Sequence, residues 1–325
     1  MTTAITIGMI IIYVAIMMGI GVYTARQTRS VSDFVLGSHS VGSWLTAFAY
    51  GTSYFSAVVF IGYAGQFGWT YGVSAAWVGV GNALLGSLLA WIVLGRRTRI
   101  MTQSLGAKTM PEYFEKRWNS KGLKIAAALI VFVFLIPYTA SVYNGLSRLF
   151  NMAFQIESEG AYKIIIIVMA LLTAIYVILG GYAATAINDF IQGIVMLIGI
   201  AAVVICAIQN QGGLTSALAA LGEIEVNGKT NTLNSVFGPD PLNLLGVVIL
   251  TSLGTWGLPQ MIHKFYAIKS ENDIKKGAVI STVFALIVAG GSYLLGGFDR
   301  LFCTLTEDGS GKTVISTLSN GKPDF

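Results

Sequence analysis

Two stretches of the sequence carry polar side chains and glycines where a membrane-spanning helix is usually apolar. Residues 49–57 read AYGTSYFSA, with five hydroxyl side chains and one glycine, and residues 251–260 read TSLGTWGLPQ, with two glycines and a proline. Proline removes a helical hydrogen bond and clashes with the preceding turn. Unwound backbone is tolerated in a bilayer only where it lines a cavity or is buried in protein. We therefore predict a broken helix at each stretch, beside a cavity.

A third candidate is the carboxylate of Asp189, at the expected cytoplasmic start of an apolar run. A charge at membrane depth costs about 2.5–3.5 kcal/mol by insertion scales, so such a residue is a functional candidate by default. The alternative is a helix cap, because Asn188 or Asp189 at the start of a helix could accept backbone N–H hydrogen bonds and complement the helix dipole. The residues alone leave both interpretations open.

The elements that must hold these groups are membrane-spanning helices. Of the 325 residues, 54% are hydrophobic and 11% are charged, whereas about 25% of a soluble domain is charged. A spanning helix needs about 20 mostly apolar residues. On that criterion the sequence predicts eight spans, centred near Ile11, Val58, Gly81, Phe132, Ile167, Leu197, Val248 and Ile287. We expect a polytopic membrane protein without a soluble domain large enough to suggest an enzyme.

The distribution of basic residues predicts the orientation of the chain. The net charge is +5, and 14 of the 20 lysines and arginines lie in the stretches 26–29, 96–124 and 264–276. Cytoplasmic loops are enriched in lysine and arginine, so these stretches are expected inside, and the N-terminus and residues 300–325 outside. The first span is then a true span rather than a signal peptide. Topology accounts for the positive charge, which therefore does not indicate a nucleic-acid partner.

The two unusual stretches hold corresponding places in the order of spans. Five spans separate the start of one from the start of the other, and the two enter the membrane from opposite sides. Interrupted helices at matching positions of inverted repeats indicate a transporter's midplane binding site. We predict one transmembrane domain over 1–325, a fragment that stops before a ninth span. Its parts are an extra helix and loop at 1–40, a first five-helix repeat at 41–208, an extracellular loop at 209–240, and the start of a second repeat with an extracellular tail at 241–325.

Five motifs of the chain resemble the sodium:solute symporter family, which includes sodium/proline, sodium/sugar and sodium/sialic acid transporters. They are residues 32–37 (SDFVLG), 51–56 (GTSYFS), 109–118 (TMPEYFEKRW), 180–192 with its GG and NDFIQ elements, and 257–260 (GLPQ). They occur in the family's order over nearly the whole chain. The resemblance implies an all-α polytopic membrane protein with a leucine-transporter-type inverted-repeat fold and an extra N-terminal helix. With about eight transmembrane helices the fold would be incomplete, its second repeat cut short.

The resemblance also implies which residues bind sodium. In the family, one sodium ion lies between backbone carbonyls of the broken second span and a Ser/Thr pair on the ninth span. By position, these carbonyls belong to Thr52 and Phe55, with the Ser56 hydroxyl nearby, and the ninth span is expected beyond this sequence. Positions similar to Asp189 help several relatives to bind a second sodium ion or guide its exit. The family role favours a sodium path over the helix cap.

A substrate cavity is expected between the two broken spans. Its predicted lining is Ser53, Tyr54, Asn144, Thr251, Thr255, Trp256 and Gln260. Asn144 shares a polar stripe with Tyr138 and Tyr143 that could instead form an interfacial belt, and Trp256 could be a packing residue. Proline-type relatives carry an aspartate at the position of Tyr54, so the resemblance does not identify the solute.

The expected function is sodium-coupled secondary active symport of a small organic solute, such as an amino acid like proline, a sugar or a carboxylate, by alternating access. The expected place is the plasma or inner cell membrane, with the sodium ion, the solute and the lipid bilayer as partners. We expect no catalytic residue, no nucleic acid, and no cofactor besides Na+ as the coupling ion. The alternative is the solute-sensing membrane domain of a symporter-like signalling protein, which a kinase-type domain downstream would indicate. The oligomeric state is not predicted.

Overall fold

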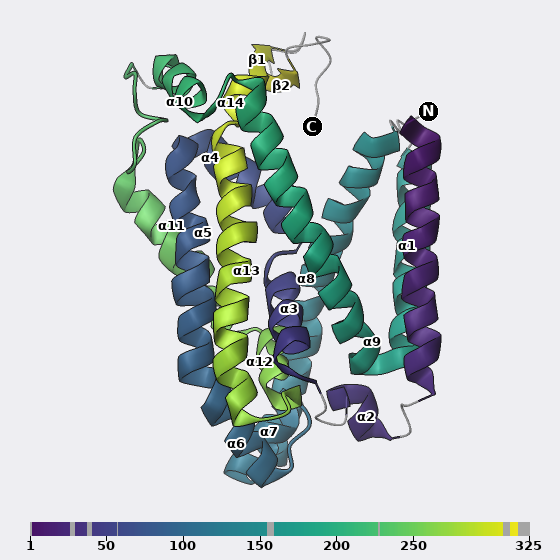
Figure 1. The fold of residues 1–325 in the computed structure, drawn as a ribbon. Helices are drawn as coiled ribbons and strands as arrows, with labels where there is room; N and C mark the ends of the chain where they lie inside the picture. Colours follow the sequence, from purple (N-terminus) through teal and green to yellow (C-terminus); the bar gives the residue numbers. More distant parts are fainter. Residues whose placement is uncertain are drawn as a thin grey trace. The chain divides into compact units, whose positions relative to one another are not determined.

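The computed structural model describes residues 2–26, 30–37, 41–56, 58–154, 159–226, 228–307 and 313–317, and the chain is built mainly of helices (Figure 1). The α-helices are α1 (Thr2–Ala25), α2 (Val31–Leu36), α3 (Ser43–Tyr54), α4 (Ala64–Tyr71), α5 (Ala76–Gly81), α6 (Arg96–Leu105), α7 (Met110–Trp118), α8 (Lys121–Phe154), α9 (Glu159–Asn210), α10 (Leu214–Glu223), α11 (Pro241–Leu253), α12 (Pro259–Ala267), α13 (Glu271–Gly297) and α14 (Asp299–Phe302). Between them lie the π-helical segments η2 (Val58–Tyr63), η4 (Asn82–Leu88) and η5 (Trp91–Gly95), and the 3-10 segments η3 (Gly72–Ala75) and η6 (Gly254–Gly257).

The chain divides into two compact units. The first comprises residues 1–54, 86–195 and 254–282, and the second comprises residues 55–85, 196–253 and 283–325. Both units draw on both predicted repeats, and the predicted repeat boundaries stay a prediction.

Several helices are long and apolar enough to cross a membrane. Among the described residues they cover Gly8–Ala25, Ala64–Leu105, Lys121–Ser147, Tyr162–Asn210 and Glu271–Gly297, which makes five, or six if α11 through α12 form one broken span. Two features explain why this number of spans is smaller than the predicted eight. The α3 helix is only 12 residues long, and α9 joins two of the predicted spans in one helix of 52 residues. The exact number of spans stays a prediction.

The exposed surface of α8 supports a membrane environment. None of residues 121–140 of α8 is buried, and the exposed side chains of this stretch include Leu129, Phe132 and Phe134. A soluble monomer rarely exposes a contiguous apolar surface of this kind. Lipid is the solvent in which such a helix is stable, so the chain is a multi-pass membrane protein.

Both predicted helix breaks are present. The α3 helix ends at Tyr54, and Phe55 and Ser56 lie outside any helix before η2 begins at Val58. The second break has a 3-10 turn at Gly254–Gly257, then Leu258 in an extended conformation (ψ 126°), then Pro259 at the start of α12. Proline suits the first turn of a helix because its missing N–H needs no partner there. The first break is narrower than the predicted unwinding at 51–56, since residues 51–54 are helical.

A kink replaces the predicted boundary between the fifth and sixth spans. Gly181 interrupts α9 with φ 57° and ψ −150°, a conformation that glycine adopts without strain. A Cβ at this position would lie 2.7 Å from the carbonyl oxygen of Phe34, so close packing on α2 also requires glycine. Asp189 therefore lies inside a helix, about two turns past the kink. The helix-cap interpretation of Asn188 and Asp189 is wrong, because the backbone groups a cap would satisfy are already paired within α9.

In the first unit, α12 is held by backbone contacts at its end. The N–H of Lys269 donates to the carbonyl of Val41 at 3.1 Å, and the Arg99 guanidinium donates to the carbonyls of Ile268 and Lys269. The chain before α3 and the end of α12 are thereby joined through a parallel bridge between Val41 and Ile268. These contacts place α12 beside α3.

Local sequence signals define the shorter elements. Thr109 accepts a hydrogen bond from the N–H of Glu112 at the start of α7, as its capping sequence predicts, and the Glu112 carboxylate accepts from the N–H of Lys108. Part of the predicted extracellular loop at 209–240 forms α10, where Ala217 and Leu221 pack against Leu233 and Phe298 of the second unit.

The C-terminal stretch, which was predicted as an extracellular tail, contains a β-hairpin. Within its described residues, β1 (Cys303–Glu307) pairs antiparallel with β2 (Thr313–Thr317). β-Branched threonine, valine and isoleucine favour strands. This hairpin is the exception to the all-α class in the described residues.

Candidate functional site

The clearest polar site in the first unit is built around Asp189. Its Oδ2 lies 3.4 Å from Nζ of Lys264 on α12, and the Thr52 hydroxyl of α3, which donates to the carbonyl of Phe48 at 2.9 Å, lies near the carboxylate. The side chains of Asp189 and Lys264 are 21% and 8% exposed. Three helices that are distant in sequence thus bring a carboxylate, a hydroxyl and an ammonium group together at a largely buried point.

Lys264 is the functional candidate that sequence reasoning missed. The charge pattern assigned it to a cytoplasmic loop, whereas the structure places it inside α12 and buries it. Its ammonium lies 5.2 Å from the ring centroid of Tyr182 on α9, which adds a cation–π contact. The signal that could have revealed it is the position of Lys264 five residues after Pro259, in a helix that continues the broken span.

The neighbours of Lys264 fix its direction. The Tyr182 ring packs edge-on against His263, with centroids 5.5 Å apart, and Nε2 of His263 contacts the carbonyl of Val35 at 2.7 Å. Tyr182 also belongs to a buried cluster with Val41, Ala186 and Ala267. These contacts pack α9 against α12 and hold the backbone of Lys264 beside Asp189.

Two amide side chains near this site lack hydrogen-bond partners. Both amide atoms of Gln260 and the Nδ2 of Asn188 are buried without a partner among the described residues. Gln260 stands one turn before Lys264 on α12, and Asn188 adjoins Asp189. A buried polar group without a partner costs about 1–3 kcal/mol. The orphaned amides are the kind of group that a bound ligand or water satisfies.

The other predicted residues of the first unit have varied surroundings. Ser53 is half-buried on α3, and Thr255 and Trp256 are half-buried in η6. The Tyr54 phenol packs against Gly86, where a Cβ would lie 2.1 Å from its oxygen, so this ring is wedged into the protein. Asn144 accepts a hydrogen bond of 2.5 Å from the Tyr162 hydroxyl, which joins α8 to α9. The substrate-cavity roles of these residues stay predictions.

The remaining predicted residues belong to the second unit. Phe55 is buried and Ser56 half-buried in the helix break. The Thr251 hydroxyl donates to Oδ1 of Asn82 at 3.1 Å, and the Ser252 hydroxyl donates to the same oxygen at 3.1 Å. Asn82 is also a hydrogen-bond partner of Tyr293. This buried network joins η4, α11 and α13, so Thr251 has a structural role beside the predicted cavity role.

The chemistry of the Asp189 site is that of cation binding. Carboxylate and hydroxyl oxygens are ligands for hard cations, and no covalent chemistry follows from this set of groups. Lys264 neutralises the carboxylate, so a second cation at Asp189 has to compete with a positive charge that is already part of the protein.

Known proteins resemble this chain over most of its length. The model of the sodium:solute symporter family matches residues 34–320. Sodium/proline symporters of Staphylococcus aureus, for example those of strains JH9 and Mu3, are 34% identical over 274 residues, which is 82% of this chain. The chain spans about half (51%) of the length of these curated relatives.

The fold is that of a solved transporter. A structure of a Na+-coupled sialic acid symporter in a substrate-bound outward-open state matches with a TM-score of 0.66 and 17% identity, over 92% of this chain and 61% of that one. This confirms the expected leucine-transporter-type fold. The similarity to transporters supports the expectation that the chain is not an enzyme. The motifs, the two broken helices and the match over residues 34–320 lead to one conclusion: the chain belongs to the sodium:solute symporter family.

Proposed function

We propose that the protein is a sodium-coupled symporter that moves a small organic solute across the cell membrane by alternating access. The observation that carries this proposal is the pair of interrupted helices, at Phe55–Ser56 and at Gly254–Leu258, in a member of this family. Carbonyls freed at such breaks can bind an ion or a solute at membrane depth, where regular helix offers none.

Sodium binding is proposed at two places. The carbonyls of Thr52 and Phe55 with the Ser56 hydroxyl form half of one site, as the family resemblance implies. Asp189 with the Thr52 hydroxyl forms the second place, on the path of sodium release. Thr52 belongs to both proposed sodium places, so the end of α3 links the predicted ion site to the Asp189 carboxylate.

Lys264 gives the second place a specific behaviour. Its ammonium group occupies the Asp189 carboxylate in this structure. A sodium ion arriving there displaces the ammonium, and departure of sodium lets the ion pair form again. The carboxylate is thus never left without a positive partner, which in a medium of low polarity would be costly.

The solute is proposed to contact Gln260, Thr255 and Trp256 near the second break. Gln260 is the best supported of these, because both atoms of its amide are buried without a partner. An amide offers one acceptor and two donors, which suits an amino acid, a sugar or a carboxylate. The relatives from S. aureus are named for proline. That name makes proline the first solute to test.

The driving force is sufficient for accumulation. One charge moving through 100 mV contributes about 2.3 kcal/mol, and a tenfold sodium gradient contributes about 1.4 kcal/mol. Together they support a solute gradient of about 500-fold per sodium ion. We further propose that the N-terminus lies outside and the basic stretches inside, as the positive-inside rule predicts.

The test is uptake by the full-length protein reconstituted in liposomes. A panel of radiolabelled amino acids, sugars and carboxylates is offered with an inward gradient of sodium or, as the matched control, of choline. Sodium-dependent accumulation of one class of solute supports the proposal. Uptake of a solute at equal rates with both cations contradicts it, and so does sodium-independent binding without transport, which favours a sensor.

A further inference from the structure

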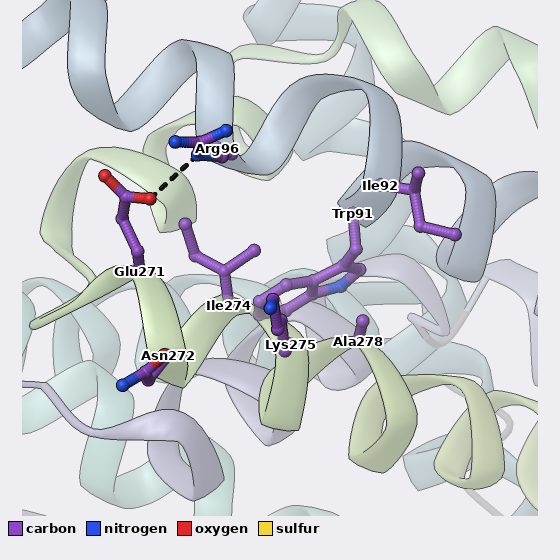
Figure 2. Close-up of a pocket in the computed structure, with 8 residues that line it drawn as sticks. All are labelled: Trp91, Ile92, Arg96, Glu271, Asn272, Ile274, Lys275 and Ala278. Atoms are coloured by element: carbon purple, nitrogen blue, oxygen red, sulfur yellow. Dashed lines mark hydrogen bonds and ion pairs between the residues drawn. The ribbon is translucent and has the colours of Figure 1, made fainter.

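A cavity of 470 Å³ lies in the first unit, between the segment η5–α6 and the beginning of α13 (Figure 2). Its lining residues are Trp91, Ile92, Arg96, Glu271, Asn272, Ile274, Lys275 and Ala278. The volume is within the range of small-molecule sites. None of these residues belongs to the Asp189 site or to the predicted substrate cavity.

Trp91 forms the buried wall of the cavity. It is 0% exposed, and its indole packs against Tyr50 and Phe265 with ring centroids 5.6 and 5.1 Å away. A Cβ at Gly277 would lie 2.5 Å from two atoms of this ring, so a glycine on α13 makes room for it. The Nε1 of Trp91 has no hydrogen-bond partner among the described residues. Because the indole is fully covered, Trp91 contributes packing to the wall and no ligand contact.

Basic groups dominate the mouth of the cavity. Nε of Arg96 donates to Oε2 of Glu271 at 2.7 Å, as the dashed line in Figure 2 marks. That pair uses one guanidinium donor and leaves the donors of the two terminal nitrogens. Lys275 forms no ion pair with any described residue. With one acid and two cations in the lining, the mouth carries a net positive charge.

The cavity connects this charged mouth with an apolar wall. Both chain segments belong to candidate spans, Ala64–Leu105 and Glu271–Gly297, and the cavity lies where each changes from charged to apolar residues. From Glu271 to Ala278 it extends about 10 Å along α13, at 1.5 Å per residue. Ile92 is 64% exposed within a candidate span, so its side chain is available to an acyl chain.

We propose that this cavity binds the headgroup of an anionic phospholipid of the cytoplasmic leaflet. The phosphate would lie between Arg96 and Lys275, the Asn272 side chain would bind an oxygen atom of the headgroup, and an acyl chain would run along Ile92. Basic pockets between spanning helices on the cytoplasmic side bind anionic headgroups in this manner. A free phosphate would use the cations but not the apolar wall. The assignment to the cytoplasmic leaflet rests on the proposed orientation of the chain, whereas the sodium and solute sites play no part in it.

Native mass spectrometry of the full-length protein in detergent tests the site. Phosphatidylglycerol and phosphatidylcholine with identical acyl chains are titrated separately, and the bound fraction is measured. The wild type is expected to prefer phosphatidylglycerol. Lys275→Gln is expected to weaken its binding about fivefold, the contribution of one basic residue. Lys276→Gln is the matched control, because Lys276 is exposed, adjoins Lys275 and does not line the cavity.

Three results would overturn the proposal. Equal binding of the two lipids would show that the headgroup charge is not recognised. Equal losses in the Lys275→Gln and Lys276→Gln variants would show diffuse attraction to a basic surface. Displacement of phosphatidylglycerol by millimolar inorganic phosphate would identify a free anion as the occupant. Both lysines are exposed, so the variants are expected to fold, and their thermal unfolding is compared with the wild type before lipid is added.

Discussion

Nζ of Lys264 lies 3.4 Å from Oδ2 of Asp189, so the structure pairs two residues 75 positions apart, both largely buried in membrane-spanning segments. Each charge alone would be costly at that depth. As a pair they are tolerated, and removal of either partner leaves the other uncompensated. We therefore expect Lys264 to compete with sodium for Asp189.

The first prediction concerns Lys264→Met, which removes the ammonium group and keeps a flexible chain of similar length. The sodium concentration for half-maximal uptake is expected to fall about fivefold or more, the scale of a typical coupling between two ligands of one site. Sodium should also raise the unfolding temperature more than in the wild type, because it replaces the missing charge. Lys269→Met changes an exposed lysine and is the control. An unchanged or increased sodium requirement in Lys264→Met would contradict the competition.

The second prediction separates the sodium role of Asp189 from its structural role. Asp189→Asn is expected to lose about 3–5 kcal/mol of stability, because Lys264 stays buried without its partner, and to lose sodium-dependent uptake. The double variant Asp189→Asn with Lys264→Gln should regain most of the stability, measured by thermal unfolding. Its uptake should remain insensitive to sodium. Recovery of normal sodium dependence in the double variant would show that Asp189 serves the fold alone.

The third prediction uses the orphaned amide of Gln260. Gln260→Leu keeps the volume and removes two buried polar atoms without partners, so stability is expected to be unchanged or slightly higher. The KM for the solute should rise about tenfold, the effect of about 1.4 kcal/mol, with little change in the sodium requirement. Gln103→Leu, at an exposed position of α6, is the control. An unchanged KM for the solute in Gln260→Leu would indicate that the amide binds water and not the solute.

The fourth prediction tests the packing of Trp91. The Cβ added by Gly277→Ala would lie 2.5 Å from two ring atoms of Trp91. Overpacking of this kind costs about 1–3 kcal/mol. The unfolding temperature of the variant should therefore decrease. Gly246→Ala is the matched control, because its added Cβ meets nothing within 4 Å and alanine favours the helix. A Gly277→Ala variant as stable as Gly246→Ala would contradict the packing.

The fifth prediction concerns orientation. Single cysteines at Lys121 and Ser216, in a cysteine-free background, are both at exposed positions. In intact cells a membrane-impermeant maleimide is expected to label position 216 and not position 121, because the basic stretch 96–124 lies inside. Permeabilisation should then expose position 121. The reverse pattern would place the N-terminus inside.

The sequence by itself determined the features that depend on neighbouring residues. The helix breaks follow from glycine and proline in residues 251–260, since proline cannot continue a helix from the preceding turn. The start of α7 follows from Thr109, whose side chain needs only the N–H three residues later. The family resemblance also predicted the fold and singled out Asp189, because its motifs lie in order along the chain.

The tertiary structure decided what depends on residues far apart. Lys264 was counted with the cytoplasmic loops, and only the packing of α12 on α9 shows that it meets Asp189. The same packing, with the kink at Gly181, places Asp189 inside a helix instead of at its start. The packing of Trp91 beside the cavity likewise requires Gly277, 186 residues later in the chain. Charge counts and periodicity report on one segment at a time, whereas burial and pairing of charges depend on the segments that pack together.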